Sequence, residues 1–397
     1  MDRTSENPAS PPRLSLGALF VKFLGFGFLA FGGPVAQIAM LRQTLVDKER
    51  WIDSARFNRL LAVLQILPGP EAHELCVHLG MVARGRLGGI VAGLGFMLPG
   101  LVLMMAAGWL YVTWITRLTG AAGILLGVQI AVLAVILRAV VRIGQHVVED
   151  WLLGLVALAA MAATLAGIPF WIPLAAGGLA YAARRPVIVV VILALATVAS
   201  VLAASLTIGD PAKPVAVGGA VTLAALFIAG LKGGLLTFGG AYTAIPYVRA
   251  DTVSRGWLSD ATFLDGIALA GMLPAPLVIF ATFVGYVAGG PWGALAITAG
   301  MFLPAFAFSL ILFERLEAVI ENPALHRLLT GVAAAVVGII AATFVQMAWT
   351  TAVRLVNPAV AAILFGVALL AAWRLKGLLA TPAVLAAGAV AGSLITL

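Results

Sequence analysis

Long apolar stretches, several of them interrupted by glycine and proline, make up most of the chain. In the first half they cover residues 16–45, 55–84, 87–114, 119–144, 151–169, 171–183 and 186–208. In the second half they cover residues 216–248, 260–288, 291–313, 325–353, 357–373 and 378–397. A helix that crosses a bilayer needs about 20 apolar residues. The pattern therefore predicts an all-α fold built from membrane-embedded helices.

Composition narrows the class of protein. Of the 397 residues, 62% are hydrophobic and 10% are charged, and no soluble domain hides that much apolar surface. We therefore expect a polytopic membrane protein that contacts the lipid bilayer, and a homodimer is left open. The chain has one cysteine, Cys76, and no nucleotide-binding or catalytic-triad pattern. We expect no disulfide, no cofactor, no metal site and no enzymatic activity.

Four of the apolar stretches are broken by residues that disrupt a helix. The breaks are Phe31-Gly32-Gly33-Pro34, Pro68-Gly69-Pro70, Phe238-Gly239-Gly240 (followed by Pro246) and Pro274-Ala275-Pro276. Such a break leaves backbone N–H and C=O groups without partners, which lipid does not tolerate unless the break lines a cavity or binds a substrate. The pieces beside each break have about 11 to 15 apolar residues, which is half a span.

The two halves repeat each other. Three groups of motifs recur at shifts of 207, 206 and 205 residues: Phe31-Gly32-Gly33 with Phe238-Gly239-Gly240, Pro68 and Pro70 with Pro274 and Pro276, and Met97-Leu98-Pro99 with Phe302-Leu303-Pro304. So small a drift indicates an internal repeat. The extra stretch 186–208 gives an odd number of crossings per copy, which inverts the second copy. We predict two inverted-topology repeats with re-entrant broken helices: a tail 1–14, a first repeat with its connecting helix 15–208, a linker 209–215 and a second repeat 216–397.

Basic residues set the expected orientation. The formal net charge is +8, and 15 of the 24 Lys and Arg residues fall at or before Arg185. Basic loops of membrane proteins face the cytoplasm, so we expect no nucleic-acid partner and a cytoplasmic N-terminus. If the broken stretches are hairpins, this orientation makes the following residues cytoplasmic: Arg3, Arg13, Arg42, Lys48, Arg50, Arg56, Arg59, Arg84, Arg86, Arg138, Arg142, Arg184 and Arg185.

We expect the substrate to bind at the breaks. Paired broken helices at a repeat interface form the sites of secondary transporters, although glycine and proline can also simply kink packed helices. Pro70 is well placed to begin a helical half, whose free N–H groups and dipole favour an anion. We expect four half-helix ends to meet near the midplane and to form an oxyanion site that needs no arginine.

Four charged side chains lie close to the breaks. Glu71 and Glu74 stand in the first turn after Pro70, either as proton-coupling carboxylates or as stabilisers of the helix N-terminus. Lys22 and Lys232 lie inside apolar stretches ahead of the Gly-Gly breaks. There they either balance the charge of a substrate or snorkel to the interface.

A series of motifs runs along the first half: Phe31-Gly32-Gly33-Pro34 with the later Trp51, Leu67-Pro68-Gly69-Pro70-Glu71, Leu79-Gly80, Gly88-Gly89 and Phe96-Met97-Leu98-Pro99-Gly100. Together they closely resemble the chromate ion transporter family in its long, two-domain form, over nearly the whole chain. The resemblance implies chromate export across the bacterial inner (plasma) membrane and chromate resistance. It also implies a substrate-binding core of Phe31, Gly32, Gly33, Pro34, Pro68, Gly69, Pro70, Glu71, Phe238, Gly239, Gly240, Pro274 and Pro276.

Two departures from the family pattern and several other functions stay open at this point. Ala275 replaces a glycine and Ala241 stands opposite Pro34, so the two halves need not contribute equally. A permease or exchanger for sulfate or another tetrahedral oxyanion would use the same site, because sulfate shares the charge and shape of chromate. A membrane enzyme would need paired polar residues near one interface, and a scaffold would not need four matched breaks.

Overall fold

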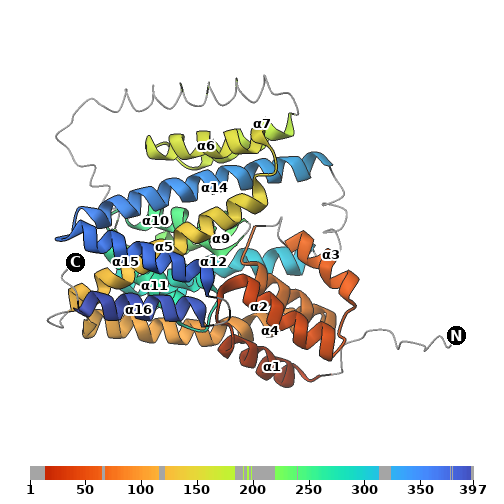
Figure 1. The fold of residues 1–397 in the computed structure, drawn as a ribbon. Coiled ribbons are helices and arrows are strands. Elements are labelled where there is room, and N and C mark those ends of the chain that lie inside the picture. Colours follow the sequence, from red (N-terminus) through yellow and green to blue (C-terminus); the bar gives the residue numbers. More distant parts are fainter. Residues whose placement is uncertain are drawn as a thin grey trace.

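The computed structural model describes residues 14–64, 68–115, 121–183, 191, 195, 198, 220–238, 240–312, 323–375, 377 and 379–394. Within these residues every regular element is a helix, which confirms the predicted fold class (Figure 1). The tail 1–13, the linker 209–215, Gly239 and all but three residues of the connecting stretch 186–208 lie outside the described residues. Four described segments are long and apolar enough to cross a membrane: Glu71–Thr113, Ala121–Val147, Leu277–Ile311 and Ala324–Ala352.

The two halves have matching series of helices. The first half contains α1 (Leu16–Phe28), α2 (Gly33–Leu41), the π-helical η1 (Arg42–Lys48), α3 (Ser54–Leu64), α4 (Glu71–Thr113), α5 (Ala121–Val147), α6 (Trp151–Leu165) and α7 (Trp171–Ala182). The second half contains α9 (Leu223–Leu235), the 3₁₀ turn η3 (Ala241–Ala244), α10 (Ile245–Thr252), α11 (Asp260–Met272), the 3₁₀ turn η4 (Leu277–Ile279), α12 (Phe280–Leu312), α14 (Pro323–Ala352), α15 (Pro358–Arg374) and α16 (Ala380–Leu394).

Equivalent helices begin at equivalent capping residues. In each case a side-chain oxygen accepts a backbone N–H of the first turn, a contact that stabilises a helix by about 1 kcal/mol. The capping residues form three pairs, 207, 206 and 207 residues apart: Ser15 and Thr222, Asp53 and Ser259, and Asp150 and Asn357. The sequence therefore specifies the start of three equivalent helices in both halves: α1 and α9, α3 and α11, and α6 and α15.

α4 and α12 are each a tight helical hairpin rather than a straight rod. Gly85 and Gly290 have φ/ψ of 62°/−160° and 64°/−160°, a conformation open essentially to glycine alone. After each turn the second limb folds back on the first, with backbone contact at Gly80 and Gly88 in α4 and at Gly285 and Gly293 in α12. Only the second limbs, 86–113 and 291–312, are long enough to be full spans, as the predicted stretches 87–114 and 291–313 require.

The second limbs of α4 and α12 lie against each other in opposite directions. A Cβ on Gly93 would meet Phe306, and a Cβ on Gly89 would meet Leu310, so residue numbers rise along one limb as they fall along the other. A helix and its own counterpart are therefore antiparallel neighbours, which is the relation that two oppositely inserted copies have. The membrane orientation of each copy stays a prediction.

The remaining long helices pack on elements from the other half (Figure 1). α5 packs on α15 and α16, whereas its counterpart α14 packs on α6 and α7. Gly127 of α5 meets Gly388 of α16, and Gly331 of α14 meets Gly177 of α7, with no room for a Cβ at any of these positions. Small residues permit this close backbone approach in membrane proteins. The largest hydrophobic core is consequently shared by the two halves.

Candidate functional site

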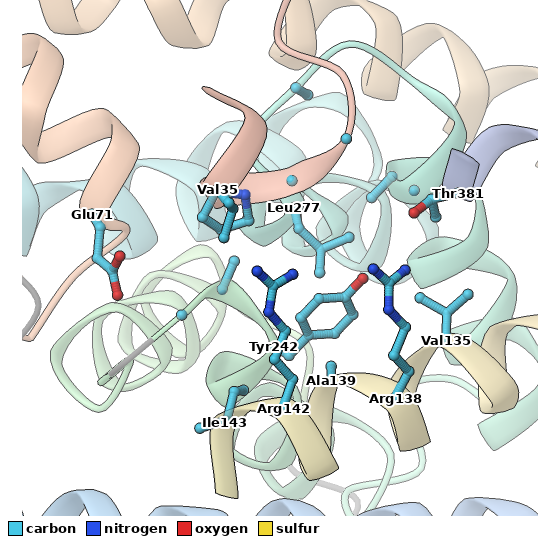
Figure 2. Close-up of a pocket in the computed structure, with 18 of the residues that line it drawn as sticks. Val35, Glu71, Val135, Arg138, Ala139, Arg142, Ile143, Tyr242, Leu277 and Thr381 are labelled. Carbon is cyan, nitrogen blue, oxygen red and sulfur yellow. The ribbon is translucent and has the colours of Figure 1, made fainter. Parts of the chain in front are cut away.

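A cavity of about 370 Å³ lies where the four breaks meet (Figure 2). Each break contributes a residue to its wall or is followed directly by one: Gly33 and Gly240 from the Gly-Gly breaks, Ala275 from the fourth break and Glu71 immediately after the second. These segments are separated by up to 242 positions in the chain (33 to 275). The fold therefore brings the breaks together on one space.

The breaks of one half are hydrogen-bonded to the breaks of the other. The Gly69 N–H donates to the Thr237 carbonyl at 2.8 Å. At the equivalent place, the buried amide Nε2 of Gln37 donates to the carbonyls of Ala30, at 2.8 Å, and Ala275, at 3.0 Å. Each junction thus satisfies backbone groups that a broken helix leaves unpaired.

Two helix N-termini of the first half open toward the cavity. Gly32 and Gly33 have left-handed φ values of 83° and 78°, and Pro34 follows in the first turn of α2. Nothing lies within 4 Å of a Cβ placed on Gly33, so glycine is needed there for backbone conformation and not for space. Pro70 caps α4, so the N–H groups of its first turn, at Glu71 and Ala72, have no intrahelical acceptor.

The second half departs from the expected four equivalent helix ends. The 3₁₀ turn Ala241–Ala244 follows the Gly-Gly break, and the 3₁₀ turn Leu277–Ile279 follows Pro276. Each turn continues directly into an α-helix, α10 from Ile245 and α12 from Phe280, so the helix ends of the second half begin with a tighter 3₁₀ turn. The N–H groups at the helix ends of the two halves therefore differ in geometry.

Two arginines of α5 point into the cavity, contrary to the expectation of a site that needs no arginine. Figure 2 shows the guanidinium groups of Arg138 and Arg142 directed into the space, with the Tyr242 hydroxyl between them in this view. Arg138 is half-buried and Arg142 is exposed. Neither has an ion pair or hydrogen bond among the described residues.

Sequence reasoning missed these two side chains because it used them only to orient the chain. A signal was present: Arg138 and Arg142 are four residues apart inside the apolar stretch 119–144. That spacing puts both on one face of a helix, and ionisable residues within a membrane helix face its interior or a water-filled cavity.

The two glutamates after Pro70 differ in position. Glu71 lines the cavity and is 7% exposed, whereas Glu74 is completely buried. Neither carboxylate oxygen of Glu74 has a hydrogen-bond partner in the part of the chain that the structure describes. A Cβ on Gly69 would collide with this carboxylate, so Glu74 lies directly beneath the second break.

The two lysines do not line the cavity. Lys22 donates to Glu49 at 2.5 Å, and Lys232 pairs with Asp251 at 3.0 Å. Gly32, Gly33, Pro34, Glu71 and Gly240 are the predicted site residues that do line it. The other described candidates are absent from the wall and adjoin it in sequence: Phe31, Pro68, Gly69, Pro70, Phe238, Pro274 and Pro276. Among the described residues no group of three His, Cys, Asp or Glu side chains is arranged to hold a metal.

Comparison with known families identifies the protein family of the chain. The family model described as "Chromate transporter" matches residues 17–183 and 224–393. The chain belongs to this family. Its two matched segments contain all four breaks, both arginines of the cavity and the hairpins of α4 and α12.

Curated relatives align over nearly full length. A "Chromate transport protein" of Pseudomonas aeruginosa is 56% identical over 386 residues, which cover 94% of this chain and 91% of the relative. A protein of the same name from Cupriavidus metallidurans is 30% identical over 85% of this chain and 84% of its own length. A "Probable chromate transport protein" of Synechococcus elongatus is 29% identical over 96% of both. No solved structure matches the chain.

Proposed function

We propose that this chain is a secondary transporter that exports chromate across the bacterial inner membrane and thereby gives chromate resistance. The observation that carries the proposal is the convergence of four helix breaks on a cavity into which Arg138 and Arg142 project. The names of the curated relatives support chromate as the substrate. The family and the apolar helices support a membrane location. The basic residues of the first half favour an N-terminus in the cytoplasm.

The charges of the cavity suit a dianion. Two guanidinium groups without partners among the described residues match the two negative charges of chromate, and each offers paired N–H donors to a tetrahedral oxyanion. The free N–H groups at the starts of α2 and α4 add donors and the positive ends of helix dipoles. A volume of about 370 Å³ holds the anion together with several waters, since one water occupies about 30 Å³ of liquid.

The membrane potential favours transport of an anion out of the cell. Moving one charge across about 100 mV is worth about 2.3 kcal/mol, so expelling a dianion from a negative interior gains about twice that. Export therefore proceeds without ATP, and the chain carries no nucleotide-binding motif. A broken-helix site at the interface of two antiparallel repeats is suited to alternating access by rocking one half against the other.

A sulfate permease or exchanger is the second candidate, and the same cavity favours it. Guanidinium and backbone N–H donors read charge and tetrahedral geometry, which sulfate shares with chromate. The substrate ranking therefore depends on the energy of removing water from each anion, which the donor set alone does not distinguish.

Flux in proteoliposomes tests the proposal. Purified full-length protein would be reconstituted with labelled chromate or sulfate inside, and efflux followed under an imposed inside-negative or zero potential. We expect chromate efflux that the negative potential accelerates, with sulfate competing. An absence of chromate flux in vesicles that contain correctly inserted protein would overturn the transport function. Flux indifferent to potential would overturn the potential-driven mechanism.

A further inference from the structure

Glu74 is the most isolated charged group in the described part of the chain. It is 0% exposed, and neither carboxylate oxygen has a hydrogen-bond partner. An ionised carboxylate buried without a partner is strongly disfavoured, and adding a proton removes most of that cost. Glu71 lies three residues earlier, on the same face of α4, so negative charges on the two carboxylates would repel each other. Through Glu71 the pair adjoins the cavity.

Among the described residues, no basic side chain forms an ion pair with Glu71 or Glu74. The titratable and charged residues on the elements around the first limb of α4 are His73, Cys76, His78 and Arg84 on the limb itself, Arg86 and Tyr111 on the second limb, Lys22 on α1, Arg56 and Arg59 on α3, Asp260 and Asp265 on α11, Tyr286 on α12 and, across the cavity, Arg138, Arg142 and His146 on α5 and Tyr242 on η3. Lys22 is engaged by Glu49. In the described part of the chain, no hydrogen bond or ion pair joins any of these groups to the Glu74 carboxylate.

His73, the buried neighbour of Glu74, does not replace a cation. Its Nε2 contacts the Gly93 carbonyl at 3.2 Å, and its Nδ1 has no partner. The ring lies edge-on to Phe302 and Phe306, with centroids 4.8 Å away in each case. The ring thus packs among aromatic side chains and makes no hydrogen bond to either glutamate among the described residues. Protonation is therefore the remaining way to neutralise the carboxylate pair.

A dianion in the cavity and a negative charge on Glu71 repel each other. We propose that Glu71 and Glu74 form a proton-binding pair, and that an oxyanion in the cavity and a proton on this pair bind cooperatively. The inference rests on the proposed anion site. Protonation forms one O–H bond on a carboxylate, with the proton drawn from water through the cavity beside Glu71. Because the coupling is reciprocal, anion binding draws a proton onto the pair, and a proton strengthens anion binding.

Proton uptake on anion binding tests the pair directly. Detergent-purified full-length protein in weakly buffered solution with a pH indicator would receive pH-matched chromate, at alkaline pH where chromate is a dianion, and in parallel sulfate. We expect the wild type and Glu149→Gln to take up a measurable fraction of a proton per anion bound. Glu149 is an exposed carboxylate outside the cavity wall, so this control makes the same charge change elsewhere. Glu71→Gln and Glu74→Gln should each take up less, and the double variant none.

The anion affinity gives a second readout. Glu71→Gln should bind chromate about tenfold more tightly than wild type at alkaline pH, within the usual range of coupling between sites, and its affinity should depend less on pH than that of the wild type. Chromate binding by the wild type without proton uptake would overturn the pair and leave the anion site intact, as would undiminished uptake in the double variant. Failure of the wild type to bind any oxyanion would instead refute the proposed function.

Discussion

The Gly69 N–H donates to the Thr237 carbonyl at 2.8 Å, joining the second break of the first half to the first break of the second. The equivalent junction joins Ala30 to Ala275 through the side chain of Gln37. Each half thus completes the backbone hydrogen bonding of the other at the cavity. A movement of one half against the other must alter both junctions, which ties the shape of the cavity to the arrangement of the repeats.

Gln37→Leu should weaken the junction between Ala30 and Ala275. It removes two hydrogen bonds and leaves two carbonyls unsatisfied, so we expect a loss of about 2 kcal/mol in the free energy of unfolding together with slower transport. Thermal unfolding of the purified protein measures the first effect. The control is Gln145→Leu, because Gln145 is exposed on α5. Equal unfolding temperatures for the two variants would contradict the structural role of Gln37.

Gly85→Ala and Gly290→Ala should each disturb a helical hairpin. Their backbone conformation costs any other residue about 1–3 kcal/mol, although open space surrounds both positions. We expect each variant to unfold at a lower temperature than wild type. Gly366→Ala is the matched control, since Gly366 lies in the regular helix α15 with free space around it and alanine there should stabilise by about 0.5–1 kcal/mol.

Lys22→Gln and Lys232→Gln should change the affinity for chromate only slightly. Both lysines are held in partly exposed ion pairs outside the cavity wall, and such pairs contribute about 0–1 kcal/mol to stability. Chromate binding to each variant would be measured by equilibrium dialysis with labelled anion. A loss as large as that caused by neutralising an α5 arginine would assign the lysines to the site after all.

Asp265→Asn should destabilise the protein by about 1–3 kcal/mol. The Asp265 carboxylate is 2% exposed and accepts hydrogen bonds from Tyr111, at 2.7 Å, and Gln129, at 2.8 Å. Arg354 donates in turn to Gln129 at 2.8 Å. Thermal unfolding compares this variant with Asp47→Asn, which changes an exposed carboxylate. Identical stability of the two variants would show that the network contributes nothing.

Features that depend on local sequence could be predicted without the structure. Glycine and proline at the breaks and apolar runs of fixed length predict half-span helices, and α1 and α9 each have 13 residues as a result. The near-constant shift between matched motifs likewise reflects matched elements, because the three capping pairs lie 207, 206 and 207 residues apart.

Features that depend on packing between the halves could not be predicted. Gln37 contacts a carbonyl 238 residues away, and no pattern near Gln37 identifies that partner. Lys22 stood out because a charge inside an apolar run is costly, yet its partner Glu49 lies beyond the first break. Arg138 faces the cavity because α5 packs against α15 and α16. These two helices belong to the second half, so the orientation of α5 depends on residues outside the first half.

The central claim is that Arg138 and Arg142 hold the dianion where the breaks meet. Binding of labelled chromate to purified Arg138→Gln, Arg142→Gln and the double variant tests it most directly, with the exposed Arg374→Gln as the matched control. A charge-assisted hydrogen bond contributes about 1.5–3 kcal/mol, and 1.4 kcal/mol is tenfold in affinity. We therefore predict a loss of about tenfold or more for each single variant, no detectable binding by the double variant and wild-type affinity for the control. Wild-type affinity in the double variant would contradict the account.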